Sequence, residues 1–229
     1  MKFFKKVLTI ILIGAFLVVL GLWSPWYKLN LNFFNLFGIN SANKYSILKV
    51  KSLHGDLSVY IDDQLKATAT DNTDFTEISP ITPGEHKITL KKQNNGNYYQ
   101  FERKVNFEPG LDVVLAYDLG PSQLFSEGHL LYSRKNFLNL ANPRLTIYSS
   151  PDNVEVYIDG NLVGNTVIKD IELDISKQHN MKFIKKGYDT IEMTLLPELQ
   201  SDRDKLKNYD LIFEVNLFTQ PIKINNTSN

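Results

Sequence analysis

An unbroken apolar segment lies near the start of the chain and predicts a membrane-spanning helix. Between Val7 and Trp23 only Thr9 carries a polar side chain, and no charged residue occurs between Lys6 and Lys28. A helix rises about 1.5 Å per residue, so this segment would extend roughly 30 Å, the thickness of the hydrocarbon core of a bilayer. We therefore expect a single transmembrane helix and little other helix in the chain.

The charges that flank this segment predict its orientation. Lys2, Lys5 and Lys6 precede it, whereas only Lys28 follows closely. Because positively charged flanks stay in the cytoplasm, we expect the N-terminus inside the cell and the residues after Lys28 outside. The alternative is a cleaved secretory signal, whose apolar segment usually has about 7 to 15 residues and ends at a small-x-small site. The sequence fits neither condition well, which favours an uncleaved signal-anchor.

Residues 29–44 are apolar but contain several asparagines, and they are too few for a second span. Two interpretations stay open for this juxtamembrane segment. One is a stalk at the membrane surface. The other, which we prefer, is that its phenylalanine side chains pack under the first folded domain.

After residue 44 the period of the apolar positions changes to two, the spacing of strands with one buried face. Val154, Val156 and Ile158 occupy alternate positions, and Asp159 and Gly160 then supply residues that tolerate the positive φ of a tight hairpin turn. Similar runs recur at short intervals, so we expect about seven strands in each half of the remaining chain. That density predicts β-sandwiches.

The pattern occurs twice, which indicates an internal duplication. Residues 57–63 align with 154–160 at an offset of 97, and residues 112–119 align with 210–217 at an offset of 98. The segments that differ in length between the copies are polar, as loops on a common scaffold would be. The expected fold class is all-β, with two tandem small β-sandwich domains after an N-terminal transmembrane helix.

The segment between the copies is too apolar for a flexible tether of the Gly/Ser type. We expect it to dock on one or both domains and to fix their relative orientation. The predicted divisions of the chain are a cytoplasmic stub and anchor at 1–28, a juxtamembrane segment at 29–44, a first β-sandwich at 45–120, a docked linker at 121–143, a second β-sandwich at 144–218 and a disordered tail at 219–229.

Composition and charge exclude several functions. The chain has 25 Lys and Arg against 25 Asp and Glu, so it offers no net positive field for a nucleic acid. It has no cysteine, which excludes disulfides, thiolate zinc sites, iron–sulfur ligation and a thiol nucleophile. Stability must then come from packed apolar surface.

The search for reactive motifs predicts no enzyme, no cofactor and no small-molecule substrate. The four histidines show no spacing that presents two ring nitrogens to a metal, and no nucleophile elbow or phosphate loop occurs. His86 and His179 hold similar positions in the two copies, and we prefer a hydrogen-bonded structural role for both. Asp62 and Asp63 align with a predicted turn, which favours a turn over a catalytic carboxylate pair.

Tyrosines and lysines gather at one hairpin of each copy and could contact a sugar or an anionic envelope polymer. The residues concerned are Tyr98, Tyr99, Lys185, Lys186 and Tyr188. The alternative, which we prefer, is that Tyr188 packs into its own domain and that the lysines keep an edge strand from aggregating.

Turn motifs in both copies carry a resemblance to a known family. The second copy has Pro151, then Asp159 and Gly160 after a strand, then Gly164, and finally Gly187 and Tyr188. This set resembles the PEGA domain. The first copy supplies the matching Pro-Gly-x-His step as Pro83, Gly84 and His86, but it has Asp63 in place of the turn glycine. We interpret the second copy as a PEGA domain and the first as a diverged relative.

The resemblance implies small extracytoplasmic β-sandwiches without catalytic residues, often tethered to bacterial or archaeal envelopes. The sequence-based prediction is a non-catalytic, single-pass membrane protein whose tandem domains act outside the cytoplasm as a spacer or protein-docking surface. Its expected partners are the membrane, through Val7 to Trp23, and envelope proteins or a cell-wall polymer. The alternative function is a glycan-binding module that uses the Tyr/Lys hairpins.

Overall fold

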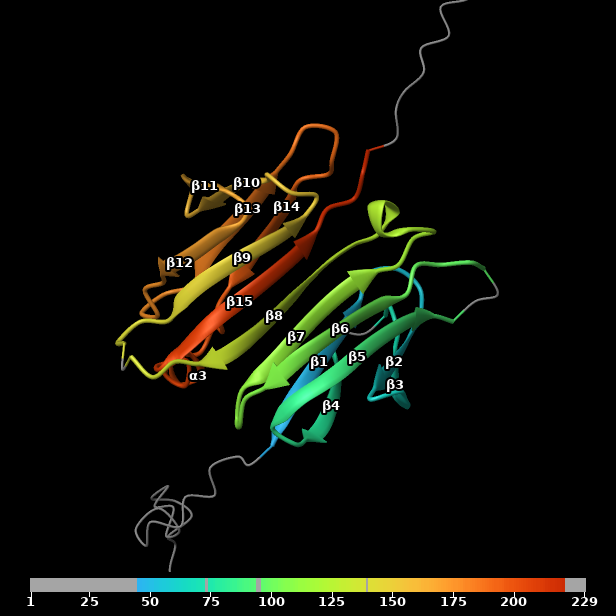
Figure 1. The fold of residues 1–229 in the computed structure, drawn as a ribbon, viewed down its shortest axis with the longest axis horizontal. Coiled ribbons are helices and arrows are strands. Elements are labelled where there is room, and N and C mark those ends of the chain that lie inside the picture. The colour runs from blue at the N-terminus through green and yellow to red at the C-terminus, as the bar shows by residue number, and fades with distance from the viewer. Residues whose placement is uncertain (1–44, 73, 94–95, 139, 221–229) are drawn as a thin grey trace, which may run out of the picture. The chain divides into compact units, whose positions relative to one another are not determined.

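The computed structural model describes residues 45–220 except 73, 94, 95 and 139. Strands dominate this part of the chain, and the only helical elements within it are a 3-10 turn, η2 (Gln123–Phe125), and one short α-helix, α3 (Gln200–Asp204) (Figure 1). The all-β prediction is therefore confirmed. No helix within the described ranges is long and apolar enough to cross a bilayer, and the predicted span at Val7 to Trp23 lies outside them.

The first half of the body contains seven strands. They are β1 (Ser46–Ser52), β2 (Leu57–Ile61), β3 (Gln64–Ala69), β4 (Thr76–Ile81), β5 (Gly84–Lys92), β6 (Phe101–Phe107) and β7 (Asp112–Asp118). β3, β2, β5 and β6 form one four-stranded sheet, and β4, β1 and β7 form the layer beneath it.

The second half repeats this arrangement strand for strand. Its strands are β9 (Arg144–Ser150), β10 (Glu155–Ile158), β11 (Asn161–Asn165), β12 (Ile168–Glu172), β13 (His179–Ile184), β14 (Ile191–Leu195) and β15 (Tyr209–Asn216). β11, β10, β13 and β14 form the second four-stranded sheet, and β12, β9 and β15 lie in the same order as their counterparts in the first half. Seven strands per half agrees with the sequence-based count.

The segment between the halves forms a strand, β8 (Glu127–Lys135), that joins them. β8 pairs antiparallel with β7 on one side and antiparallel with β15 on the other. The result is a single sheet of seven strands in the order β12-β9-β15-β8-β7-β1-β4. We call β8 with its two neighbours the seam. Sequence analysis expects this segment to dock but does not foresee a strand there.

The two four-stranded sheets cover opposite faces of the long sheet (Figure 1). Successive side chains of a strand point to opposite faces. On β8, Leu130 belongs to the first hydrophobic core, while Leu131 packs against the second. The same alternation holds on β15, where Phe213 is fully buried in the second core and Glu214 points to the other face. In each half, the four-stranded sheet covers one face of the long sheet, and the opposite face of the same strands is left uncovered.

Strand directions place the two Tyr/Lys hairpins at the same end of the body. β1 runs parallel to β7, and both β7 and β15 run antiparallel to β8, so all three point the same way. Beyond the end of β7, the amide of Tyr99 donates to the carbonyl of Gly120 at 2.8 Å. Beyond the end of β15, the amide of Asp189 donates to the carbonyl of Phe218 at 2.9 Å. The start of β1 lies at the opposite end of the sheet.

Candidate functional site

A turn held by an aspartate and a histidine recurs in the two halves. In the second half, Oδ2 of Asp159 lies 2.9 Å from Nδ1 of His179, and Oδ1 accepts from the amide of Asn180 at 3.0 Å. Nε2 of His179 lies 2.9 Å from the carbonyl oxygen of Asp174. Asp159 and Gly160 have φ values of 51° and 79°, which a tight turn requires. The aspartate thus fixes the histidine ring and the turn together, and we call this arrangement the Asp–His lock.

The first half builds the same lock from Asp62 and His86. Oδ2 of Asp62 lies 2.6 Å from Nδ1 of His86, and Oδ1 accepts from the amide of Lys87 at 2.9 Å. Nε2 of His86 lies 2.9 Å from the carbonyl oxygen of Thr82. Asp62 and Asp63 have φ values of 50° and 63°, so their predicted turn is confirmed.

The charges around each lock keep its aspartate ionised. The ammonium of Lys177, the amide of Asn180 and the His179 ring hold the pKa of Asp159 well below its usual value. The pKa of Asp62 is lowered in the same way by His86 and by the amide of Lys87. Both rings have acceptors at both nitrogens, so the lock explains these histidines as structural residues.

The other residues of the motifs lie at strand ends and turns, except Gly164, which lies inside β11 beside a bulge in its pairing with β10. Gly164 and Gly187 have positive φ values of 140° and 85°, and Gly84, at the start of β5, has a φ of 128°. Pro83 precedes β5, and the carbonyl of Pro151, just after β9, accepts from the hydroxyl of Ser149 at 2.6 Å. These positions give the motif residues a role in shaping the turns, the strand ends and, at Gly164, the bulge.

The tyrosines and lysines proposed as ligand contacts have different surroundings. Nζ of Lys185 donates to the carbonyl of Asp152 at 2.8 Å and also to that of Asn153, while Lys186 is exposed. Tyr188 is half-buried against the second core and forms a bridge to the backbone of Thr219.

In the first half only one of the two hairpin tyrosines turns toward a cavity. Tyr98 is exposed, with the ammonium of Lys92 lying 5.1 Å from the centre of its ring. Tyr99 is half-buried and lines a groove at the seam. Of the five hairpin residues, Tyr99 is the one that contributes to the groove.

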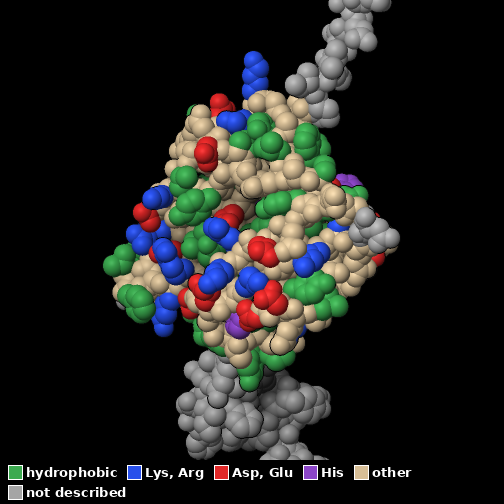
Figure 2. Space-filling model, turned by 45° about the vertical axis from the view of Figure 1, so that its right-hand side comes forward, with side chains coloured by type: hydrophobic (Ala, Val, Ile, Leu, Met, Phe, Trp, Pro, Cys, Tyr) green, Lys and Arg blue, Asp and Glu red, His purple; other side chains and the backbone are tan. Residues whose placement is uncertain are grey.

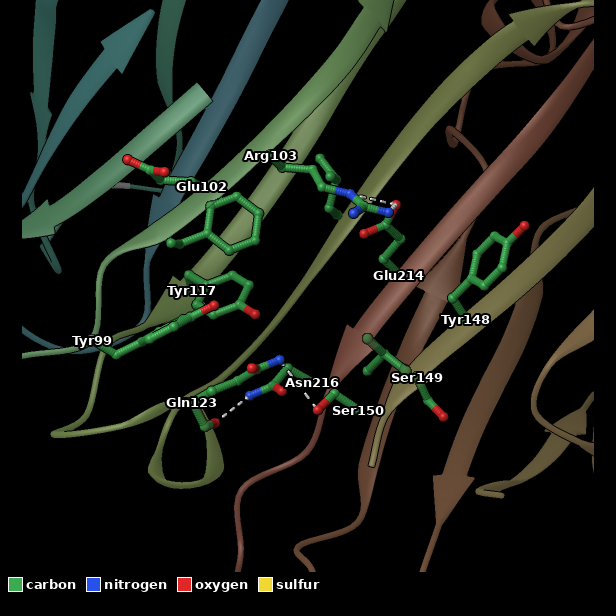
Figure 3. A pocket seen from close by; sticks show the side chains of 13 residues that line it. Tyr99, Glu102, Arg103, Tyr117, Gln123, Tyr148, Ser149, Ser150, Glu214 and Asn216 are labelled. Carbon is green, nitrogen blue, oxygen red and sulfur yellow. Dashed lines mark hydrogen bonds and ion pairs between the residues drawn. The ribbon is translucent and has the colours of Figure 1, made fainter. Parts of the chain in front are cut away.

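The groove lies where the two halves meet and has a volume of about 180 Å³ (Figure 3). The first half supplies one wall from β6 and the residues before it, and the second half supplies the other from β9 and β15. It forms here because β6 is the last strand of its sheet and β15 and β9 are uncovered on this face. Its polar lining includes the side chains of Tyr99, Arg103, Tyr117, Tyr148, Ser150 and Glu214.

An ion pair between the halves crosses one end of the groove. The guanidinium of Arg103 on β6 donates to Oε1 of Glu214 on β15 at 2.6 Å, and Tyr132 on β8 donates to the same oxygen at 3.1 Å. Burial and the Glu214 charge raise the pKa of Tyr132 to about 12, so its hydroxyl stays protonated and donates. This end of the groove is polar but has no net charge.

Two tyrosine hydroxyls at the groove have no protein partner among the residues that the structure describes. Tyr117 on β7 is 5% exposed, and its ring centre lies 4.6 Å from that of Phe101. Its hydroxyl and that of Tyr99 point toward the middle of the groove (Figure 3). Burial raises the pKa of both hydroxyls, so both are neutral donors and acceptors at physiological pH.

Of the residues that line the groove, only Tyr99 is among the contacts predicted from the sequence. The ion pair at the end of the groove joins residues 111 positions apart, and no local motif marks it. Aligning the two halves by their strand registers would have pointed to Arg103. Ile88 pairs with Arg103 in the first half, and the equivalent pair in the second half is Met181 with Met193. A charged residue at a position that is apolar in the other copy indicates a special environment.

The described ranges hold no group of three or more His, Asp or Glu side chains placed to bind a metal ion. Figure 2 shows basic and acidic side chains interspersed over the face turned to the viewer, without a continuous patch of one sign. This mixture on that face agrees with a chain whose formal charge is zero.

The fold and its locked turns define a body of two small all-β units joined through one sheet. A PEGA domain is found at residues 142–202, which covers most of the second half and includes its Asp–His lock. This finding confirms the resemblance for the second copy. Comparison with curated proteins and with solved structures finds no match.

Proposed function

We propose that this chain is a non-catalytic envelope protein, anchored by residues 7–23, that presents its β body outside the cytoplasm as a spacer or protein-docking surface. The observation that carries the proposal is the pairing of β8 with both halves. A body joined by a continuous sheet bends far less than two domains on a loop, because bending it would break backbone hydrogen bonds. A spacer needs that stiffness.

The first half is proposed as a second, diverged PEGA-like domain. Its strand order matches that of the second half, and it repeats the Asp–His lock with Asp62 and His86. Equal topology and an equal lock at equivalent turns support descent from one duplicated unit. The first half lacks the turn glycine, but Asp63 adopts a positive φ in its place.

The direction of the strands supports a function in display. The chain enters the body at the start of β1, and both Tyr/Lys hairpins lie at the far end of the sheet. If residues 7–23 hold the entry point close to a membrane, the hairpins face away from it. A partner protein in the envelope would then meet the hairpin end first.

Site-specific labelling tests the anchoring and the orientation. The chain has no cysteine, so single variants Lys2→Cys and Lys186→Cys each carry one reactive thiol in the full-length protein. We expect a membrane-impermeant maleimide to label Lys186→Cys in intact cells, and to label Lys2→Cys only after the cells are permeabilised. The cysteine-free parent is the control for background labelling.

Two results would reject this proposal. One is labelling of Lys2→Cys in intact cells, and the other is full release of the protein from membranes by alkaline carbonate, which leaves spanning helices in place. The mass of the mature protein also distinguishes the uncleaved anchor from a processed signal.

A second candidate is glycan binding by the hairpin residues, and the observation that favours it is that both hairpins lie at one end of the sheet. The exposed Tyr98 and Lys186 are the residues to change, since neither belongs to a core. Retention of the full-length protein on purified wall polysaccharide, lost in Tyr98→Ala and Lys186→Ala, would support this candidate. Equal retention of the variants would exclude the hairpins as the binding site.

A further inference from the structure

We propose that the groove at the seam is a binding site for one ring of a neutral saccharide. The proposal goes beyond the spacer role, and it does not depend on how the chain is anchored. It rests on the size of the groove, its unpaired tyrosine hydroxyls, the lack of a free cation in its lining and its aromatic walls.

The size of the groove suits a small polar ring. Its volume of about 180 Å³ corresponds to roughly six water molecules at about 30 Å³ each. Drug-sized ligands occupy larger pockets, of about 300 to 1,000 Å³. A single six-membered sugar ring with its hydroxyls fits this space, and the remainder of a longer chain would continue into solvent.

The hydroxyl of Tyr117 is the strongest indication of a ligand. The residue is 95% buried, since only 5% of it is exposed, yet its hydroxyl makes no hydrogen bond within the described part of the chain. Its oxygen is not sealed from solvent, because within the described residues only the hydroxyls of Thr89 and Thr219 are fully buried without a partner. The Tyr117 hydroxyl is therefore open to the groove. The hydroxyl points into the groove beside that of Tyr99, which also lacks a protein partner there (Figure 3). Two neighbouring phenols can bind two adjacent hydroxyls of one sugar.

The charges of the groove disfavour an anionic ligand. Its lining holds the carboxylates of Glu102 and Glu214 and the single guanidinium of Arg103, and Glu102 accepts from the side-chain amide of Gln100. Arg103 and Glu214 neutralise each other across its end, and Tyr132 supplies a further hydrogen bond to Glu214. A free cation would be expected in a site for a phosphate or carboxylate polymer, because an unpaired Arg or Lys binds such groups. When Arg103 and Glu214 are paired, Arg103 still has N–H groups that can donate to sugar hydroxyls, and Glu214 still has oxygen lone pairs that can accept from them.

The far wall offers an aromatic surface with polar groups beside it. Tyr148 on β9 is 40% exposed, so part of its ring is available to the flat apolar face of a sugar. Next to it, the hydroxyl of Ser150 accepts from the side-chain amide of Gln123 at 3.3 Å, a long and weak bond that a ligand could replace. Both walls therefore combine a tyrosine with groups that bind hydroxyls.

The test is saturation-transfer NMR of the full-length protein in a detergent without a sugar head group. The probes are maltotriose, cellotriose, mannotriose and triacetylchitotriose, with trigalacturonate as the anionic comparison. We expect transfer to at least one neutral trisaccharide and weaker or no transfer to trigalacturonate. The key variant is Tyr117→Phe, which removes one hydroxyl and keeps the ring that packs on Phe101.

Tyr117→Phe separates binding from folding. We expect affinity for the bound sugar to fall at least tenfold while the melting temperature stays equal or rises, because the hydroxyl has no protein partner to lose. Tyr148→Ala should weaken binding by a similar factor. The matched control is Tyr157→Phe, whose hydroxyl bonds Glu155 away from the groove and whose loss should leave binding unchanged.

The proposal fails if none of the four neutral trisaccharides shows transfer, or if Tyr117→Phe binds as tightly as the parent. Tighter binding of trigalacturonate than of every neutral probe would also overturn it, because the groove would then select for charge. None of these results bears on the membrane anchor, so failure of the binding site and failure of the proposed function remain distinguishable.

Discussion

The two faces of strand β8 differ in chemistry although the halves that flank it share one topology. On one face, Leu130 is followed outward by the Arg103–Glu214 pair and the groove. On the other, Leu131 packs against the second core, and the His129 ring stacks on Phe213 with 5.6 Å between ring centres. Two halves of equal topology thus carry different side chains at equivalent register positions, which places a polar groove on the first face and an aromatic stack on the second.

The strongest test of this comparison removes the leucine on each face of β8. Leu130 is 1% exposed within the first core, so Leu130→Ala should cost about 3 kcal/mol of unfolding free energy. Leu131 is only partly buried, so Leu131→Ala should cost about 1 kcal/mol. Urea denaturation of the full-length protein in detergent measures both. Equal losses would show that the leucine beneath the groove is packed no more tightly than the leucine that faces the second core.

The second test measures how lowering the pH affects stability through His129, which lies on the Leu131 face of β8. Burial lowers the pKa of His129 to about 4, against an unfolded value near 6.5, so the folded protein prefers the neutral ring. The stabilisation is complete above pH 6.5 and is lost as the pH falls toward 4, because the unfolded chain then binds more protons. Between pH 7.5 and pH 5 we expect a loss of about 2 kcal/mol from this group.

The variant His129→Leu should remove most of that pH dependence. Its denaturation midpoint, measured at pH 7.5 and at pH 5, should differ less than that of the parent. The aspartates of the two locks titrate at lower pH, so they contribute little in this window. An unchanged pH dependence in the variant would mean that His129 is not the responsible group.

The third test concerns what the halves share. Asp159→Ala and Asp62→Ala each remove the acceptor for a histidine ring and for a backbone amide. We expect each variant to lose about 1.5 kcal/mol of stability, as for the loss of a capping side chain. The thermal unfolding of the two variants should shift by similar amounts. A loss confined to Asp159→Ala would mean that the lock has decayed in the first half.

The smallest effect on stability is expected when the polar residues of the groove face are replaced by the apolar residues found at the equivalent positions. Arg103→Met copies the residue at the equivalent position, Met193, and breaks a half-exposed ion pair worth about 0.5 kcal/mol. Adding Glu214→Ala, which copies the equivalent Ala116, should recover that loss. A double-variant cycle on the denaturation midpoint measures the coupling. A coupling above about 2 kcal/mol would instead make this pair a principal support of the seam.

The turns and strands could be predicted from the sequence because local chemistry decides them. Asp62, Asp159 and Gly160 stand where positive φ is needed, and the period-two pattern marks strands with one buried face. The repeated strand order could be predicted from two matched segments, and their offsets of 97 and 98 agree with the strand registers that pair Leu48 with Val113 and Leu145 with Leu211.

Strand β8 could not be predicted in the same way, for a physical reason. One of its faces belongs to the first core and the other to the second, so apolar residues occur at consecutive positions, as in Leu130 and Leu131. No period of two remains, and the segment resembles an apolar linker. The groove could not be predicted from the sequence either, because Arg103 and Glu214 come into contact only when both halves pair with β8.

The joining strand also limits how many units one chain can connect in this manner. The last strand of each unit, β7 or β15, has a neighbour on both sides, β8 on one and β1 or β9 on the other. Neither has a free edge to receive another joining strand, so a third unit would have to attach at the outer strands β4 or β12, where the sheet ends. A joining strand like β8 can therefore connect only two units of this topology.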